Sequence, residues 1–337
     1  MQLENGFWDP RVLAVSLSEL TLLVAPNRQS ATMRVAIVAV GELARYFVEE
    51  LQARGHDVVA VSRSRKPYLD ALGVAQHVAA DYSAQQLRDA LADCDAAVCT
   101  LRGGVPQFAA IHASILAACR QSATCKRFIP SAWAGNLEEF PDEPLDWADE
   151  LVPVFDALRG QTDISWSAIC PGWYADYVVP ASQRHLGDIG DMWPQNHGEK
   201  TFTLYGKGSQ LVNFTSARDT ARATIALLEH DRHSWEDFTY VSGAQMSWRQ
   251  LGDFVKSRDP AYTFKRKSLA QSVRQYVANE SPESRAVAIF ELWGHSEALH
   301  FPWAKVQRHR EKFFKGLAFR NLAELADEAQ ADPTKVV

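Results

Sequence analysis

Three small residues, Ala39, Gly41 and Ala44, have the AxGxxA spacing of a phosphate-binding turn. In such a turn one small residue lets the chain bend, one lets phosphates approach the backbone, and one lets a helix pack closely on a strand. The apolar run 35–40 predicts the strand, and the helical spacing of apolar residues over 43–51 predicts the helix. The amides that open this helix would then face a diphosphate. Because only one of the three residues is glycine, an ordinary strand–helix crossover is the alternative.

A cluster of cations follows the next expected strand, 57–61. The segment consists of Ser62, Arg63, Ser64, Arg65 and Lys66, in which the arginines and the lysine are the cations. Enzymes that use NAD often carry an acid near this point for the ribose hydroxyls, whereas arginine suits the 2′-phosphate of NADP. The sequence therefore favours NADPH over NADH, with Arg63 as the first contact. A solvated basic loop is the alternative, since runs of charge usually lie on the surface.

Strand-like and helix-like segments alternate along the chain. Strands are expected at 74–80, 96–101, 127–130, 165–170 and 239–242, and helices at 84–91, 108–119, 151–159 and 219–228. This alternation predicts an α/β fold with a Rossmann-type, doubly wound parallel sheet. Such sheets bind ligands beyond the carboxyl ends of their strands. The expected cofactor contacts are therefore Ala39, Gly41, Glu42, Leu43, Arg63, Arg65, Lys66, Thr100, Leu101, Arg102, Pro130, Pro171 and Gly172.

The sequence divides into three parts. Residues 1–32 precede the pattern and are expected to lie outside the fold, because Met33 looks like a natural first residue. Residues 33–170 are expected to form the dinucleotide-binding domain. Residues 171–337 are expected to form a smaller, mixed substrate-binding region that returns sheet elements to the first domain. Within it, the long polar stretch 182–200 is a candidate lid.

The composition restricts the class of protein. The chain has 337 residues, a hydrophobic content of 47% and a formal net charge of −6. An acidic chain of this kind is not expected to bind nucleic acid, and the apolar segment 13–25 is too short for a membrane span. Five cysteines without CxxC spacing indicate neither a disulfide framework nor a metal site, and they fit a cytoplasmic setting. The expected partner is a small molecule.

Six stretches between Arg34 and Leu228 occur in a familiar order. They are RVAIVAVGELARYFVEEL, AADYSAQQLRDAL, DCDAAVCTL, KRFIPSAWAGNLEEF, SAICPGWYADY and TLYGKGSQLVNFTSARDTARATIALL. Together with the C-terminal FPWAKVQRHREKFFKGLAFRNLAEL, they resemble the NmrA-like and isoflavone-reductase-like branch of the atypical short-chain dehydrogenases, especially its fungal members. The resemblance implies an NADPH-binding Rossmann-type domain and a smaller C-terminal substrate domain. It further implies either reduction of aromatic or polyketide-like metabolites or dinucleotide sensing without turnover.

The chain departs from that family's pattern at several positions. Residues 38–40 replace the glycines that usually precede Gly41, and Ala132 and Ala134 replace the acid and glycine of PSEFG. By alignment, Leu151 takes the place of the lysine that isoflavone-reductase relatives carry. The YxxxK pair of ordinary short-chain dehydrogenases becomes WxxxL, which begins at Trp147. Because neither indole nor leucine is a general acid, the usual proton relay is absent.

Four residues could replace that relay. Ser131 could hydrogen-bond a substrate carbonyl, or it could cap the turn that follows it. Tyr174 is the first candidate for a catalytic acid, and packing of its ring in the pocket without proton transfer is the alternative. His185 and His197 titrate near neutrality within the candidate lid, so either could donate a proton as the lid closes. Ordinary surface positions are the alternative for both histidines.

Tryptophans gather near the expected strand ends. The expected substrate pocket consists of Trp133, Trp147, Trp173, Tyr177 and Trp193. Such walls would suit a flat, hydrophobic metabolite, although core packing explains tryptophans equally well. The sequence therefore favours an NADPH-dependent reductase of an aromatic or polyketide-type molecule in secondary metabolism. The alternatives are an NADP(H)-sensing regulator with a protein partner and an isomerase or cyclase that keeps the dinucleotide as a scaffold.

Overall fold

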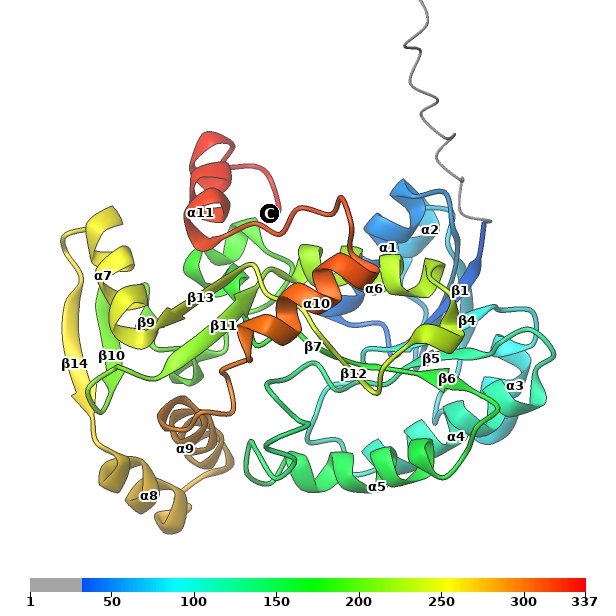
Figure 1. Ribbon diagram of the computed structural model, residues 1–337, viewed down its shortest axis with the longest axis horizontal. Coiled ribbons are helices and arrows are strands. Elements are labelled where there is room, and N and C mark those ends of the chain that lie inside the picture. Colours follow the sequence, from blue (N-terminus) through cyan, green and yellow to red (C-terminus); the bar gives the residue numbers. More distant parts are fainter. Residues whose placement is uncertain (1–31) are drawn as a thin grey trace, which may run out of the picture. The chain divides into compact units, whose positions relative to one another are not determined.

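The protein is built around a parallel sheet of six strands, which a computed structural model describes together with the rest of residues 32–337 (Figure 1). The strand order is β3-β2-β1-β4-β5-β6. The strands are β1 (Arg34–Val38), β2 (Asp57–Ser62), β3 (Ala75–Val78), β4 (Ala96–Cys99), β5 (Arg127–Ile129) and β6 (Ser165–Trp166). The expected Rossmann-type α/β fold is confirmed, and the order reverses between β1 and β4, where such sheets bind ligands. The expected N-terminal extension lies, but for its last residue, outside the described residues.

Helices cover both faces of this sheet (Figure 1). One face carries α1 (Glu42–Ala53) and α6 (Ala217–Glu229), and the other carries α3 (Ala84–Leu91), α4 (Phe108–Gln121) and α5 (Ala148–Arg159). The short α2 (Pro67–Ala71) follows β2. The side chains of β1 alternate between the two faces, because Val35 and Ile37 pack with α1 whereas Ala36 and Val38 pack with α3 to α5. Burial on both sides explains why the strands read as continuous apolar runs.

The strand expected over 165–170 is divided in two. After β6 the chain passes Ser167 and continues as β7 (Ala168–Cys170), which pairs in parallel with β12 (Phe238–Tyr240). The hydroxyl oxygens of Ser167 and Thr239 lie 2.8 Å apart and satisfy each other in the core. A segment from the C-terminal half therefore returns to the edge of the first sheet.

The C-terminal region adds two small sheets, in the orders β13-β11-β8 and β14-β10-β9. Their strands are β8 (Trp173–Tyr174), β9 (Gln195–Asn196), β10 (Thr201–Tyr205), β11 (Leu211–Thr215), β13 (Ala244–Ser247) and β14 (Thr263–Lys267). The helices of this region are α7 (Trp248–Arg258), α8 (Leu269–Ala278), α9 (Pro282–His295), α10 (Trp303–Phe313) and α11 (Leu322–Ala331). Short 3-10 helices η1 (Ala175–Val178), η2 (Ala181–Gln183), η3 (Gly190–Met192) and η4 (Arg232–Ser234) complete it. The candidate lid therefore contains η3 and β9 in addition to loops.

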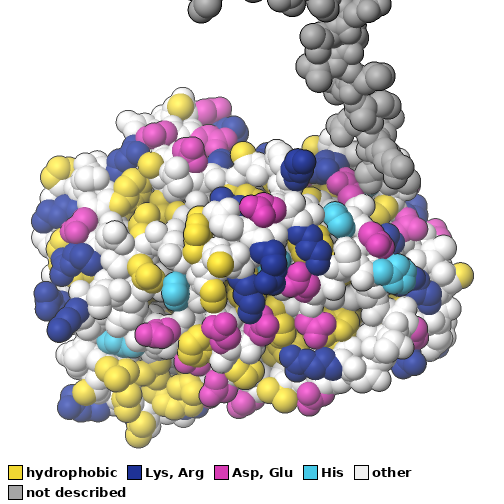
Figure 2. All heavy atoms as spheres, in the orientation of Figure 1, with side chains coloured by type: hydrophobic (Ala, Val, Ile, Leu, Met, Phe, Trp, Pro, Cys, Tyr) yellow, Lys and Arg dark blue, Asp and Glu magenta, His cyan; other side chains and the backbone are white. Residues whose placement is uncertain are grey.

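An apolar stripe lies on the exposed side of α8. Figure 2 shows hydrophobic atoms gathered over α8, where Leu269, Val273 and Val277 are exposed at helical spacing.

Within residues 32–337, none of the helices has both the length and the apolar composition that crossing a membrane requires. All five cysteines are free and buried. Burial raises the pKa of Cys99 and Cys170 to about 12, which fits their expected role as small core residues.

Candidate active site

The turn after β1 leaves the first amides of α1 open to a ligand. Gly41 is the N-cap residue of α1 and has no side chain to accept a hydrogen bond from the first turn. A Cβ at Gly41 would meet, among the described residues, only the Ala39 carbonyl oxygen at 4.0 Å. Unpaired N–H groups and the positive end of the helix dipole therefore face free space. This arrangement suits an anion.

Ala39 keeps the bend of the turn without a glycine. Its φ of 68° lies in the left-handed region, which costs a residue with a Cβ about 1 kcal/mol. Two hydrogen bonds hold it there. The Ala39 amide donates to the Val61 carbonyl at 2.8 Å, and its carbonyl accepts from the Thr100 hydroxyl at 3.0 Å. The backbone at Ala39 is thus tied to the ends of β2 and β4.

The open end of α1 borders a cavity of about 520 Å³. The expected cofactor contacts that line it are Gly41, Glu42, Leu43, Thr100, Leu101, Arg102 and Gly172. The other expected site residues that line it are Ser131, Tyr174, Trp133, Trp147, Trp173 and Tyr177. Thirteen residues that are far apart in the sequence therefore meet at one place, as expected for residues beyond the ends of parallel strands. The volume is typical of small-molecule sites.

A further part of the cavity wall comes from the candidate lid and from α9. The loop residues Leu186 to Ile189, Met192, and Phe290 and Trp293 of α9 complete it. The polar stretch 182–200 does cover the site, as expected of a lid. The α9 contribution has no signal in the sequence, because it depends on how the C-terminal helices pack. The ring of Trp173 lies 5.4 Å, centroid to centroid, from the rings of both Phe290 and Trp293.

Some expected contacts lie away from this cavity. Trp193 packs behind its wall, with its ring 5.6 Å from Trp173 and 5.7 Å from Tyr177, so it supports the pocket without lining it. Pro130 and Pro171 are buried and also do not line it. Their carbonyls instead accept hydrogen bonds from the protein, at the Ala132 amide and the Thr215 hydroxyl respectively.

Tyr174 and Ser131 differ in what their hydroxyls can do. The Ser131 hydroxyl donates to the Leu101 carbonyl at 2.7 Å, so its proton is already used to join the loops after β4 and β5. The Tyr174 hydroxyl is buried and has no hydrogen-bond partner among residues 32–337. Burial, with a smaller contribution from the Asp176 carboxylate, raises the pKa of Tyr174 well above its usual value. Tyr174 therefore keeps its proton at neutral pH.

The two lid histidines are held in structural contacts. The His185 ring lies 2.6 Å from the Glu49 carboxylate of α1, and its side chain is nearly buried. The His197 ring lies 3.0 Å from the Tyr177 carbonyl. Neither histidine lines the cavity, so the expectation that one of them donates a proton to bound substrate is wrong in this structure. Their partners are distant in sequence, which is why the lid alone suggested free side chains.

The cations after β2 have different surroundings. Arg65 pairs with Asp70, with 2.6 Å between nitrogen and oxygen, and Lys66 is the N-cap residue of α2. Arg63 is exposed, and its backbone contacts the hydroxyl of Tyr82, a buried residue at a left-handed φ of 54°. None of the three cations lines the cavity. Arg63 is therefore the cation with the freest side chain for a phosphate at this strand end.

The two residues at the positions of the YxxxK pair line the cavity. Trp147 and Leu151 both line it, next to Glu150. The Glu150 carboxylate accepts a hydrogen bond from the Gly104 amide at 3.0 Å and so fixes the loop after β4. An apolar leucine therefore occupies this part of the wall. The described part of this wall presents no cation at that position.

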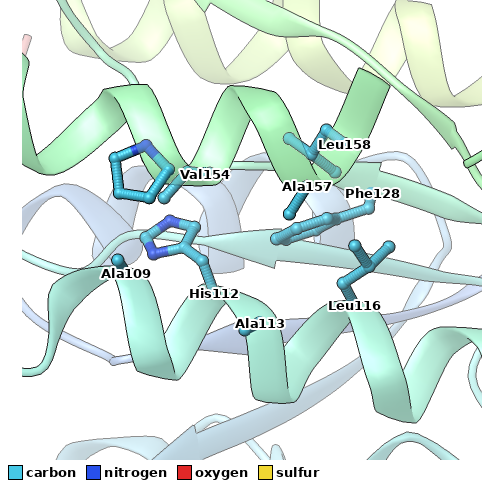
Figure 3. Close-up of a pocket in the computed structure, with 9 residues that line it drawn as sticks. Ala109, His112, Ala113, Leu116, Phe128, Val154, Ala157 and Leu158 are labelled. Atoms are coloured by element: carbon cyan, nitrogen blue, oxygen red, sulfur yellow. The ribbon is translucent and has the colours of Figure 1, made fainter. Parts of the chain in front are cut away.

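His112 of α4 is a site residue that the sequence analysis missed. Its Nδ1 lies 2.8 Å from the Phe108 carbonyl and therefore carries the proton. Its Nε2 then accepts the Ser131 amide at 3.0 Å. The ring lies between α4 and α5, beside a void of about 20 Å³ (Figure 3). A neutral imidazole thus holds the turn that carries Ser131 and Trp133.

Replacing His112 tests this role. His112→Phe keeps a ring but leaves the buried Ser131 amide without an acceptor, which is expected to lower the free energy of unfolding by about 2 kcal/mol. His112→Gln offers a carbonyl oxygen to the same amide and is expected to lose less. Urea denaturation of both variants measures the difference. Equal losses would show that the amide contact does not matter.

The same histidine predicts a dependence of stability on pH. Burial lowers the pKa of His112 from 6.5 to about 4, so the folded protein keeps the ring neutral. The unfolded chain binds a proton below about pH 6.5, so stability falls as the pH falls through this window. At His112 this loss amounts to about 2 kcal/mol between pH 7 and pH 5. His112→Phe should lose correspondingly less over the same interval, and equal slopes would contradict the assignment.

Comparison with known proteins identifies the family. A family model described as NAD(P)H-binding matches residues 39–231, which is more than half of the chain. The chain belongs to this NAD(P)H-binding family. It is also 36% identical over 306 residues to "Oxidoreductase swnR" of Metarhizium robertsii, covering 90% of this chain and 100% of that protein. The open α1 amides and the free space beside Gly41 fit the diphosphate of such a cofactor.

Solved structures agree with the fold. The NADPH complex of leucoanthocyanidin reductase from Vitis vinifera superposes with a TM-score of 0.71 at 14% identity, covering 89% of this chain and 100% of that one. AtPrR2 with NADP+ and (+)pinoresinol gives a TM-score of 0.69 at 16% identity, covering 87% and 97%. The resemblance stated from the sequence is therefore confirmed: the fold is that of the isoflavone-reductase-like group, and the family binds NAD(P)H.

Proposed function

We propose that the protein is an NADPH-dependent reductase that acts on a flat, apolar small molecule of aromatic or polyketide type. One observation carries this proposal: the open amides of α1 and a set of aromatic side chains line the same cavity. Its volume of about 520 Å³ can bury most of a small ligand. A regulator that only senses the dinucleotide would need the part of this space beside the α1 amides, but not the part lined by aromatic side chains.

The two halves of the chain would divide the work. Residues 33–170 would hold the cofactor, with the amides of Gly41 to Leu43 on the diphosphate. Residues 171–337 would close the substrate pocket, because Trp173, Phe290 and Trp293 all belong to them. Bound NADPH would supply a hydride. The aromatic walls would orient a planar substrate and keep water away from it.

Tyr174 would supply the proton-donating group. A carbonyl that accepts a hydride becomes an alkoxide, which needs a hydrogen-bond donor in the transition state. The raised pKa of Tyr174 keeps the phenol protonated, and its hydroxyl has no competing partner among the described residues. Ser131 would act as a positioning residue, since its own proton is bound to Leu101.

Arg63 would set the preference for NADPH. Its exposed guanidinium stands at the end of β2, and a charge-assisted hydrogen bond to a 2′-phosphate would be lost in Arg63→Ala. We expect the Kd for NADPH to rise about tenfold or more, with little change for NADH. Arg65→Ala is the matched control, because Arg65 is already paired with Asp70. Fluorescence titration with both nucleotides measures this, and equal weakening of the two would overturn the assignment.

Turnover separates the reductase from its alternatives. The protein should oxidise NADPH in the presence of some members of a panel of aryl ketones, chalcones and naphthoquinones, with a reduced product seen by mass spectrometry. An isomerase or cyclase would convert a compound without consuming NADPH. Tight NADPH binding with no conversion of any compound would favour the sensing regulator.

A further inference from the structure

The loop 184–189 is built around a buried cation. The Arg184 guanidinium donates to the Leu186 carbonyl at 2.6 Å and to the Gly187 carbonyl at 2.8 Å. It also pairs with the Asp188 carboxylate and lies over the Tyr177 ring, 4.9 Å from its centroid. Because one side chain binds several groups of the loop, the loop has a fixed shape of its own.

Two contacts join this loop to α1. At its base, the His185 amide donates to the Tyr46 hydroxyl at 2.8 Å, and the His185 ring contacts Glu49. At its tip, the Gly187 amide donates to the Glu42 carboxylate at 2.9 Å. A Cβ at Gly187 would lie 2.8 Å from the other oxygen of Glu42, so the tip and the Glu42 carboxylate are in close contact. The base contacts α1 through Tyr46 and Glu49, whereas the tip contacts α1 through Glu42.

Glu42 lies at the start of α1, where the diphosphate of the cofactor is expected to bind. It is the first residue of α1, and it lines the cavity together with Gly41 and Leu43, whose amides are open to a diphosphate. The positive end of a helix attracts any nearby anion, so an acid in the first turn and a bound diphosphate compete for it.

We propose that Glu42 is a latch. In the free protein its carboxylate holds Gly187, and with it the tip of loop 184–189, against α1. The diphosphate of the dinucleotide displaces the carboxylate, so that binding of the cofactor releases the tip while His185 keeps the base in place. The latch rests on NAD(P)H binding at α1 and is independent of whether the protein reduces a substrate.

Binding measurements test the competition. Glu42→Gln keeps an oxygen for the Gly187 amide but removes the charge, so the Kd for NADPH should fall about tenfold, as expected for a unit charge close to a partly hydrated dianion. Glu42→Ala should show a similar gain. Asp57→Asn makes the same change of net charge at the exposed start of β2. This is the end of the strand away from the expected cofactor contacts, so the Kd should stay unchanged. An unchanged Kd in Glu42→Gln would overturn the latch.

Hydrogen exchange tests the release without any enzymatic assay. In the absence of nucleotide, the Gly187 amide should exchange faster in Glu42→Ala than in wild type, and about equally in Glu42→Gln and wild type. Addition of NADPH to wild type should speed exchange at Gly187 but not at His185. Slower exchange at Gly187 with NADPH would overturn the latch. If wild type binds no NADPH at all, the cofactor site itself fails, and the latch fails with it.

Discussion

Replacing Tyr174 with phenylalanine is expected to lower the rate of reduction of an aryl ketone about 100-fold or more, since a positioned proton donor contributes 10²- to 10⁴-fold. The substitution removes a single hydroxyl from a residue that lines the cavity. That hydroxyl is buried, has no partner among residues 32–337, and keeps its proton because its pKa is raised well above the usual value. Binding of NADPH should change less than twofold, because the expected diphosphate contacts lie on α1.

The free energy of unfolding of Tyr174→Phe is the control, because it separates a loss of catalysis from a loss of structure. A buried hydroxyl without a partner costs free energy in the folded state, so Tyr174→Phe should unfold at the same or a higher urea concentration than wild type. Tyr205→Phe removes a hydroxyl from a buried residue that does not line the cavity, and it should keep its activity. Full turnover in Tyr174→Phe would mean that water or another group supplies the proton. A loss of both activity and stability would assign Tyr174 a structural role instead.

The raised pKa of Tyr174 also predicts the shape of the pH profile. The phenol must be protonated to donate, and its pKa lies well above 10. Deprotonation of Tyr174 therefore does not lower the rate of reduction anywhere below pH 10. A decline centred between pH 7 and pH 9 that disappears in Tyr174→Phe would contradict this environment for the hydroxyl.

The fold could be predicted because its strands are buried on both faces. Segments such as 35–38 and 96–99 are continuous apolar runs, and polar or glycine-containing turns separate them from amphipathic helices. Because the strands are parallel, their carboxyl ends lie at one edge of the sheet, so the residues after each strand are expected to lie close together. This is why Gly41, Thr100 and Gly172 were found in the cavity wall from the sequence.

The rest of the site depends on contacts between distant segments. Phe290 and Trp293 reach the cavity only through the packing of α9, and no local pattern marks them as pocket residues. His112 looks like one polar residue on the buried side of a helix until its Nε2 is seen to accept the Ser131 amide. His185 illustrates the reverse error, because its partner Glu49 lies 136 residues earlier in the chain. Charge and spacing alone could not distinguish a lid proton donor from an anchor.

Gly172 is the position where a single methyl group is expected to do the most damage to the fold. It follows β7 with a φ of 71°, and a Cβ there would lie 2.1 Å from the carbonyl oxygen of Asn213 in β11. The added atom cannot be avoided by a side-chain rotation, because both partners are backbone. Gly172→Ala should therefore lower the free energy of unfolding by about 4 kcal/mol or more, in the range reserved for severe packing defects.

Gly73 separates the effect of the clash from that of the backbone angle. Its φ of 67° is nearly the same as that of Gly172, but no atom of the described residues lies within 4 Å of a Cβ built on it. Gly73→Ala should therefore cost only the left-handed strain, about 1 kcal/mol. Urea denaturation of the two variants under identical conditions measures both values. Similar losses would mean that β11 moves away from the added methyl group. In that case the packing of Gly172 on β11, directly before Trp173 and Tyr174, would be looser than the contact between Gly172 and Asn213 implies.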